Sequence, residues 1–329
     1  MKDPISDTLS VVIPLHNESE LLDALFARLL PTLDGIGISY EVICVNDGSD
    51  DDTLEQILAI RAGNAHVKAL DLTRRFGKEV ALTAGIEHAL GDVVVVMDGD
   101  LQDPPELIPP MVKKWQEGFQ VVYATRQTRD GDSLLKKMTA KAFYTLFNRL
   151  SDTSIPPDAG DFRLMDRDVI EALNRLPERS RFMKGLFSWV GFRQTGIPFE
   201  RPSRHAGRSK WSYLKLFRFA LDGLFSFSTL PLRIWIWVGS VIASTSFLYA
   251  VYLMLRTLFQ GVDQPGYASL MVTVLFLGGI QLISIGVVGE YIGRIFDETK
   301  RRPLYLIHQA YGVRVVNSQD QKNHLQASN

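Results

Sequence analysis

Two aspartates separated by one glycine form the short pattern with the clearest chemical meaning in this sequence of 329 residues. Asp98 and Asp100 follow the apolar run at residues 93–97, and Gly99 lets the backbone bend between them. Their hard oxygen ligands suit Mg²⁺ or Mn²⁺, which also take oxygens from a substrate diphosphate. Acidic turns are common, so the pair alone is weak evidence. Its place directly after a continuously apolar strand favours a metal site for a phosphorylated substrate.

Polar residues also follow two other runs that are rich in Val and Ile. Asp47 lies in the acidic stretch at residues 46–52, and the earlier run ends in the segment at residues 14–18, which contains His16 and Asn17. Ligands collect at the carboxyl ends of the strands in an open parallel sheet, because loops and helix N-termini meet there. We therefore expect these residues to lie along one edge together with the aspartate pair.

The elements that must position these residues alternate between strand and helix over residues 1–200. The strand-like runs are residues 9–14, 40–46, 67–73 and 92–98. Leucines recur at helical spacing after the first run, which predicts a helix there. Thr53 with Gln56 predicts a capping box at the start of the next helix. Residues 78–90 are expected to form a third helix, which stops at Gly91. Continuously apolar strands occur where helices cover both faces of a parallel sheet. The predicted fold class is α/β.

Two charge-free segments near the C-terminus, residues 234–255 and 267–289, are long enough to cross a bilayer. A helix rises about 1.5 Å per residue, and a hydrocarbon core is about 30 Å thick. The alternative is a pair of buried helices in a large soluble core, but such helices rarely run about six turns without a charge. Lysines and arginines flank the outer ends of the pair, and the connecting loop holds only Arg256 and Asp263. This asymmetry predicts that both ends are cytoplasmic.

The segment before the first apolar run combines aromatic residues with charges such as Lys215 and Arg218. It is too polar to span a membrane and is expected to lie as an amphipathic helix in the headgroup layer; a helix of the soluble core is the alternative. The expected organisation is a catalytic domain at 1–210, an interfacial helix at 211–232, two transmembrane helices within 233–296 and a cytoplasmic tail at 297–329.

The composition excludes several classes of protein. The formal net charge of −1 provides no basic field for a nucleic-acid backbone, so no nucleic-acid partner is expected. The single cysteine, Cys44, cannot form an intrachain disulfide or a thiolate cluster. The six histidines, among them His16 and His308, lack the spacing of a metal site and are interpreted as structural.

Several longer segments resemble one known family. They are VVIPLHNE, EVICVNDGSDDDT, LTRRFGKEVALTAGI, VVVVMDGDLQDPPE, ATR, AGDFRLMDR, RHAGRSKWSY and GVVGEYIGRIF. Together they resemble the GT-A glycosyltransferases of family 2, in particular the polyprenyl-phosphate glycosyltransferases. The resemblance implies a GT-A (Rossmann-like), mostly parallel sheet domain followed by a two-helix transmembrane hairpin. Gly99 stands where Ala is usual and Arg75 where Asn is common, and the guanidinium of Arg75 would add a contact to the sugar or phosphate of the donor.

The resemblance implies a donor site for a nucleotide-sugar. The residues implied to bind it are Pro14, Asn17, Glu18, Asp47, Lys78 and Asp98. Asp47 would contact the nucleotide base, and Asp98 and Asp100 would hold Mg²⁺ or Mn²⁺ on the diphosphate. Gln102 would reach toward the metal or the acceptor phosphate.

The resemblance also implies an acceptor site for a polyprenyl phosphate. The residues implied to bind phosphate are Arg126, Arg204, Ser209 and Lys210. Asp161 corresponds to the family's acid near the acceptor. It would act as a general base or orient Arg163, Arg126 or the acceptor. The structural alternative is that Asp161 only caps the turn in which it lies. A phosphate monoester has a second pKa of about 6, so its oxygen can attack without a strong base.

The expected function is that of a membrane-anchored, metal-dependent, inverting glycosyltransferase. It would move a sugar, with a glucose-like sugar favoured, from a UDP-sugar to undecaprenyl phosphate at the cytoplasmic leaflet of a bacterial inner membrane. The alternatives are a processive polysaccharide synthase, whose Gln-x-x-Arg-Trp motif is not found, and a non-catalytic scaffold that binds nucleotide-sugar. Glycines such as Gly278 and Gly286 would permit close helix packing in a homo-oligomer.

Overall fold

A computed structural model of the chain describes residues 8–126, 159–179, 181, 183–199, 230–260 and 266–314. Eight strands form one mixed sheet in the order β7-β5-β6-β4-β1-β2-β3-β8. The strands are β1 (Thr8–Leu15), β2 (Ser39–Asn46), β3 (Val67–Leu72), β4 (Val93–Val96), β5 (Val121–Arg126), β6 (Ala159–Asp166), β7 (Gln194–Phe199) and β8 (Ile307–Tyr311). Strands β4, β1, β2 and β3 run parallel, whereas β6 and β8 run antiparallel to their neighbours. The four expected strands are confirmed, and their ends differ by at most a few residues.

Helices cover both faces of this sheet, as the continuously apolar strands predicted. One face packs against α1 (Ser19–Asp34), α2 (Thr53–Gly63), η1 (Pro105–Leu107) and α4 (Ile108–Gln116). The other face packs against α3 (Lys78–His88), α6 (Arg167–Asn174) and α7 (Met183–Trp189). Along β1, Val11 and Ile13 join the first core and Val12 joins the second, because successive side chains point to opposite faces. The α/β fold class is confirmed.

The capping box predicted at Thr53 is wrong. Asp52 is the residue that precedes the first turn of α2, and it makes no side-chain capping bond. The Thr53 hydroxyl donates to Asp51 Oδ1 at 2.5 Å and accepts from the backbone N–H of Glu18 at 3.1 Å. Thr53 therefore ties the β1–α1 loop to the start of α2, a long-range contact that a local sequence pattern does not reveal.

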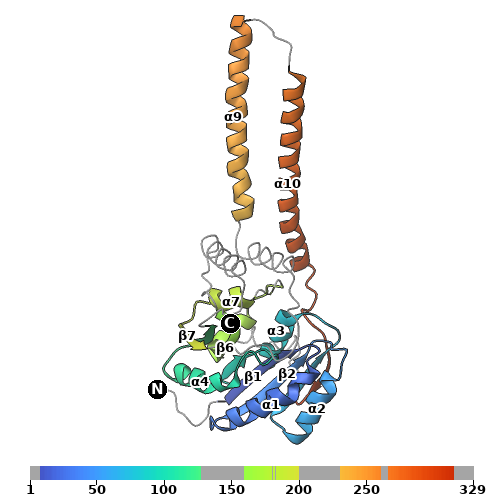
Figure 1. The fold of residues 1–329 in the computed structure, drawn as a ribbon, viewed down its shortest axis with the longest axis vertical. Coiled ribbons are helices and arrows are strands. Elements are labelled where there is room, and N and C mark those ends of the chain that lie inside the picture. The colour runs from blue at the N-terminus through green and yellow to red at the C-terminus, as the bar shows by residue number, and fades with distance from the viewer. Residues whose placement is uncertain are drawn as a thin grey trace, which may run out of the picture.

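Two long helices, α9 (Leu230–Gln260) and α10 (Tyr267–Thr299), extend together away from the sheet domain (Figure 1). Their apolar side chains are largely uncovered; Trp237 is 74% exposed and Leu282 is 72% exposed. Of the described residues, Phe276–Thr299 forms the one helical stretch that is long and apolar enough to cross a membrane, and Trp237–Tyr249 is a shorter apolar stretch. The interfacial helix expected at 211–232 lies almost entirely outside the described residues.

After α10 the chain returns to the sheet domain, where only a tail was predicted (Figure 1). Strand β8 pairs with the edge strand β3, and the Thr73 backbone N–H donates to the Leu306 carbonyl at 3.0 Å. Tyr305 donates its hydroxyl hydrogen to Glu87 of α3. Strand β8 has five residues, IHQAY, in which apolar and polar residues do not alternate, so its sequence carries little strand signal.

Candidate functional site

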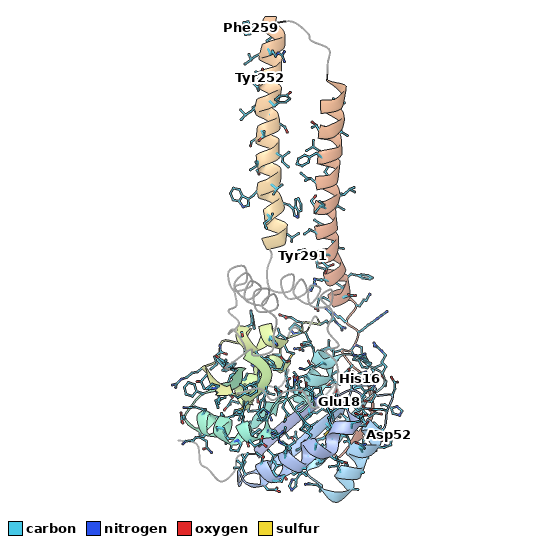
Figure 2. The ribbon with its side chains drawn as sticks, viewed as in Figure 1. His16, Glu18, Asp52, Tyr252, Phe259 and Tyr291 are labelled. Carbon is cyan, nitrogen blue, oxygen red and sulfur yellow. The ribbon has the colours of Figure 1, made fainter. Side chains whose placement is uncertain are left out.

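The residues expected to do chemistry lie at the carboxyl ends of the parallel strands. Figure 2 shows His16 and Glu18, which follow β1, near Asp52, which precedes α2, on one side of the sheet domain. Asn17 accepts at its side-chain oxygen from the backbone N–H of Asp50 at 2.9 Å, and its own N–H donates to the Ser49 hydroxyl at 3.1 Å. The loops after β1 and β2 therefore form one hydrogen-bonded unit.

A lysine connects two carboxylates at the centre of this edge. The Lys78 Nζ atom, at the start of α3, lies 2.6 Å from Asp98 Oδ1 and 2.6 Å from Asp161 Oδ2. The three side chains are partly exposed, at 40% for Lys78, 25% for Asp98 and 16% for Asp161, so a ligand can reach them. Burial alone would lower the pKa of Lys78, but the charges of Asp161 and Asp98 outweigh it and hold that pKa well above its usual value. Lys78 is therefore the positive partner of both carboxylates.

Asp161 has further basic neighbours. The Lys184 Nζ atom of α7 lies 3.9 Å from Asp161 Oδ1. Burial would raise the pKa of Asp161, but the charges of Lys184, Lys78 and Arg163 outweigh it and lower that pKa. Arg163 is 4% exposed and its guanidinium lies 4.0 Å from the centre of the Phe187 ring; burial lowers its pKa to about 10. Asp161 is thus ionised at neutral pH.

Two other acids next to this cluster are held partly protonated near neutrality. Burial raises the pKa of Glu79 to about 7, and the charge of Asp161 adds to that shift. Burial also raises the pKa of Asp103 to about 8, reinforced by the charge of Asp98. Asp103 Oδ2 accepts the backbone N–H of Asp98 at 3.0 Å. Asp103 therefore supports the turn that carries Asp98.

The turn after β4 presents oxygen ligands in a constrained backbone. Asp100 Oδ1 accepts the backbone N–H of Gln102 at 3.1 Å, and Leu101 between them has a φ of 60°, which a branched side chain adopts only at a cost. Gln102 is 7% exposed, and its Oε1 atom has no hydrogen-bond partner among the described residues. This turn thus presents the carboxylates of Asp98 and Asp100 and one unpaired amide oxygen.

These oxygens fit a divalent cation that shares its ligands with a substrate. The described residues contain no group of three or more His, Cys, Asp or Glu side chains arranged to hold a metal by themselves. Mg²⁺ is usually bound through one or two carboxylates together with substrate phosphates, so Asp98 and Asp100 offer the protein's share of such a site. The cluster with Lys78 is therefore suited to a diphosphate and its metal.

Asp47 fixes the loop that leads to Lys78. Its Oδ1 atom accepts the backbone N–H of Phe76 at 2.6 Å, and its Oδ2 atom accepts that of Gly77 at 2.9 Å. Both carboxylate oxygens are thus engaged by the protein backbone. Its expected contact with a nucleotide base stays a prediction.

Gly48 packs against the backbone of residues 74–75 in the same loop, so its substitution tests the packing of that loop. It has a φ of +58°, and a Cβ atom there would lie 2.5 Å from the Arg74 carbonyl carbon and closer still to the Arg75 nitrogen. We expect Gly48→Ala to destabilise the protein by about 2–3 kcal/mol, since neither backbone can shift without breaking the Asp47 bonds. Thermal unfolding of the full chain measures this effect.

Gly37 provides the matched control for that substitution. It has a φ of +78°, but a Cβ atom there meets nothing within 4 Å. Gly37→Ala should cost only the backbone strain, about 1 kcal/mol. Equal destabilisation by the two substitutions would show that the contact between Gly48 and the loop does not matter.

A cavity of about 590 Å³ lies beside this loop, within the usual range for ligand pockets. The residues that line it are His16, Asn46, Gly48, Ser49, Asp50, Asp51, Leu54, Glu55, Asp71, Leu72, Thr73, Arg74, Arg75 and His308. Arg75, the residue that departs from the family pattern, is therefore a wall residue. None of the six residues expected to bind the nucleotide-sugar is in the lining; Asn17 and Glu18 instead support it through their bonds to Ser49, Asp50 and Thr53.

The structure brings together only part of the expected acceptor site. Arg126 ends β5 opposite Phe199 of β7, and its side chain lies outside the described part, as do Arg204, Ser209 and Lys210. Conversely, no sequence pattern indicated Lys184 or His308 as site residues. Lys184 lies in a short helix 23 positions after Asp161 in the numbering, and only the fold shows that the two are neighbours.

Comparisons with known proteins agree with the two-part organisation of the chain. Residues 10–173 match glycosyl transferase family 2, and residues 230–295 match the GtrB C-terminal hairpin. An uncharacterized glycosyltransferase of Synechocystis sp. is 56% identical over 93% of this chain and 96% of its own length. A prophage bactoprenol glucosyl transferase homolog of Escherichia coli is 46% identical over 91% of this chain and 98% of its own length. The crystal structure of glucosyl-3-phosphoglycerate synthase from Mycobacterium tuberculosis aligns with a TM-score of 0.46 at 20% identity, covering 67% of this chain and 78% of that one.

Proposed function

Because the chain belongs to glycosyl transferase family 2, we propose that it transfers a glucosyl group from a nucleotide-sugar to a polyprenyl phosphate. The observation that carries this proposal is the Lys78, Asp98 and Asp161 cluster at the carboxyl ends of the strands. The relatives named for bactoprenol glucosyl transfer support the lipid acceptor and the sugar. UDP-glucose is the donor we propose.

Separate sets of side chains would act on the leaving group and on the acceptor. Asp98 and Asp100 would hold Mg²⁺ or Mn²⁺ on the donor diphosphate, and Gln102 offers one more oxygen. When bound, such a cation neutralises the charge that builds on the departing nucleotide diphosphate. Lys78 stands beside Asp98 and supplies a further positive charge at the same place. A single displacement by the acceptor oxygen inverts the anomeric carbon and needs no protein nucleophile.

Asp161 is proposed to orient basic groups toward the acceptor. Its pKa is lowered, so it is a weak base at neutral pH, and it lies against Lys78 and Lys184. These two ammonium groups can bind the acceptor phosphate while Asp161 sets their positions. Arg126, Arg204, Ser209 and Lys210 stay proposed phosphate ligands.

The pH dependence of transfer separates this role from general-base catalysis. The Asp161 carboxyl stays ionised from pH 6 to 8, since its pKa lies below its ordinary value. We therefore expect Asp161→Asn to lower kcat/KM by one constant factor across pH 6 to 8, with both profiles following ionisation of the acceptor phosphate. If the substitution removed an alkaline-rising limb that the unaltered enzyme shows, Asp161 would be the base.

The apolar helices place the proposed reaction at a membrane. Polyprenyl tails are insoluble in water, so their phosphate is available only at a bilayer surface, and α9 with α10 would hold the sheet domain there. We propose a multi-pass protein of the bacterial inner membrane with its catalytic domain, residues 1–210, in the cytoplasm. An interfacial helix at 211–232, transmembrane helices within 233–296 and a cytoplasmic segment from 297 complete the proposed arrangement.

Transfer can be tested directly with the full chain in detergent or lipid discs. Incubation with radiolabelled UDP-glucose, undecaprenyl phosphate and Mn²⁺ should yield a labelled lipid whose mass equals the acceptor plus one hexose. GDP-mannose and UDP-N-acetylglucosamine serve as competing donors. A protein that binds UDP-glucose yet labels no lipid with any donor would be a scaffold, and long polymer products would indicate a synthase.

A further inference from the structure

The strand that returns from the apolar helix pair forms part of the wall of the 590 Å³ cavity. His308, in β8, lines this cavity together with residues from the ends of β2 and β3 and the start of α2. The register of β8 against β3 shifts between Asp71 and Leu72, which pair with Gln309 and Ile307. His308 is thus the extra residue of a bulge, and bulges re-aim side chains next to functional sites.

This wall is firmly attached to the catalytic domain. Tyr305, Ile307 and Ala310 pack against the core cluster under α3, and Tyr305 also bonds to Glu87 in α3 itself. At the other end of the connection, the Arg179 backbone N–H donates to Glu298 Oε1 at 2.7 Å, beside the last turn of α10. The segment that carries His308 is therefore held in place by pairing with β3 and by packing against this core rather than by the cavity.

One loop connects the cavity wall to the diphosphate cluster. Thr73, Arg74 and Arg75 line the cavity, and the same loop continues to Lys78, which contacts Asp98. A nucleotide-sugar whose diphosphate lies at Asp98 and Asp100 would extend its nucleoside along this loop toward the cavity. Polar acceptors from Asp50 and Asp71 in the lining suit ribose hydroxyls and base N–H groups.

Two flat rings in the lining suit the nucleoside. Among the described lining residues, His16 and His308 are the ones with aromatic rings. Imidazoles stack on nucleobases and also donate or accept hydrogen bonds. The His16 ring is already placed by a 3.1 Å contact between its Nδ1 atom and the Asp47 carbonyl, whereas His308 has an exposed side chain.

We propose that His308 binds the nucleoside of the donor and helps to determine which nucleotide the enzyme accepts. The inference rests on the proposed function, and it assigns a donor-binding role to the segment after the transmembrane hairpin. The donor pocket is then completed by a strand that reaches the sheet only after the chain has passed through both apolar helices. Correct insertion of those helices and formation of the donor pocket are thereby linked.

Steady-state kinetics of the full chain test this assignment. With UDP-glucose and undecaprenyl phosphate, His308→Ala should raise the KM for UDP-glucose about tenfold, in line with the loss of one stacked or hydrogen-bonded ring. The KM for the lipid and the kcat should change less than about twofold, and His308→Phe should recover most of the donor affinity if stacking dominates. A split of this kind does not arise from general damage to the fold.

Gln309 is the matched control, because it is the next residue of β8, is also exposed, and does not line the cavity. Gln309→Ala should behave like the unaltered protein. An unchanged donor KM in His308→Ala, or an equal rise in Gln309→Ala, would overturn the proposal. Calorimetric titration with UDP distinguishes failure of this assignment from failure of the proposed function. If the unaltered chain binds UDP but transfers no sugar, the proposed function fails. A tenfold weaker Kd for UDP in His308→Ala would still support the role of His308.

Discussion

Replacing Asp100 with alanine is expected to lower glucosyl transfer by about 100-fold or more. The substitution removes one of two carboxylates that the turn after β4 presents, and it also removes the acceptor that fixes the Gln102 backbone N–H. The step most sensitive to this loss is departure of the nucleotide diphosphate. Two opposite charges about 4 Å apart gain about 4 kcal/mol at an effective dielectric constant near 20, which corresponds to several powers of ten in rate.

The measurement is initial transfer rate against Mn²⁺ concentration, for the unaltered chain and for Asp100→Ala. The variant should need far more Mn²⁺, and excess EDTA should abolish transfer by the unaltered protein. Glu106→Ala is the control: Glu106 is an acid six residues further along the chain, 54% exposed and paired with Arg28, so its loss should change the rate less than about twofold. Normal activity of Asp100→Ala, or full activity in EDTA, would show that the aspartate pair is not a metal site.

The strands and their ends were predictable because the forces that define them are local in sequence. Runs of Val and Ile are typical of strands buried on both faces of a parallel sheet, so the sequence predicted β1 and β4. The position of the aspartates at the end of β4 could be predicted from the same run. The prediction at Thr53 failed for the opposite reason. Its hydroxyl is engaged by Asp51 and Glu18, and a contact with the β1–α1 loop overrides the local capping pattern.

The site's partners could not be read from spacing, because they come from distant parts of the chain. Lys78 and Asp161 are 83 positions apart and meet only because β6 lies beside β4 in the sheet. Strand β8 is harder still to predict, since it follows two long apolar helices and is defined by pairing with β3 rather than by its own composition. The family resemblance singled out Lys78 and Asp161 individually, and the fold supplied their contact.

Replacing Lys78 with methionine is expected to lower transfer by about 100-fold, because it removes a charge from both sides of the site at once. Methionine keeps the length and the apolar stem of the side chain, so packing at the start of α3 should persist. Asp98 and Asp161 would then face each other without the ammonium that lies 2.6 Å from each. The donor diphosphate would also lose a positive charge beside its leaving oxygen.

The same substitution has a second signature in the dependence of stability on pH. Lys78 and Lys184 together lower the pKa of Asp161, so the stabilisation from that carboxylate is present at neutral pH and is lost as pH falls through its folded pKa. Without Lys78 the folded pKa moves back toward its ordinary value, so the variant should lose less stability than the unaltered protein as pH falls from 5 to 3. Thermal unfolding over that pH range measures the difference.

Lys68→Met separates a site effect from the loss of any ion pair of this kind. Lys68 Nζ lies 2.6 Å from Glu41 Oε2, the same distance as in the Lys78 pairs, but this pair links β3 to β2 away from the strand ends that carry Asp98 and Asp161. Lys68→Met should therefore lower the Tm and leave the transfer rate of the folded protein within about twofold. If the activity lost by Lys78→Met and by Lys68→Met only followed the stability that each variant loses, the ion pairs of Lys78 would have a structural role alone. The carboxylates that Lys78 joins would then not form the reaction centre.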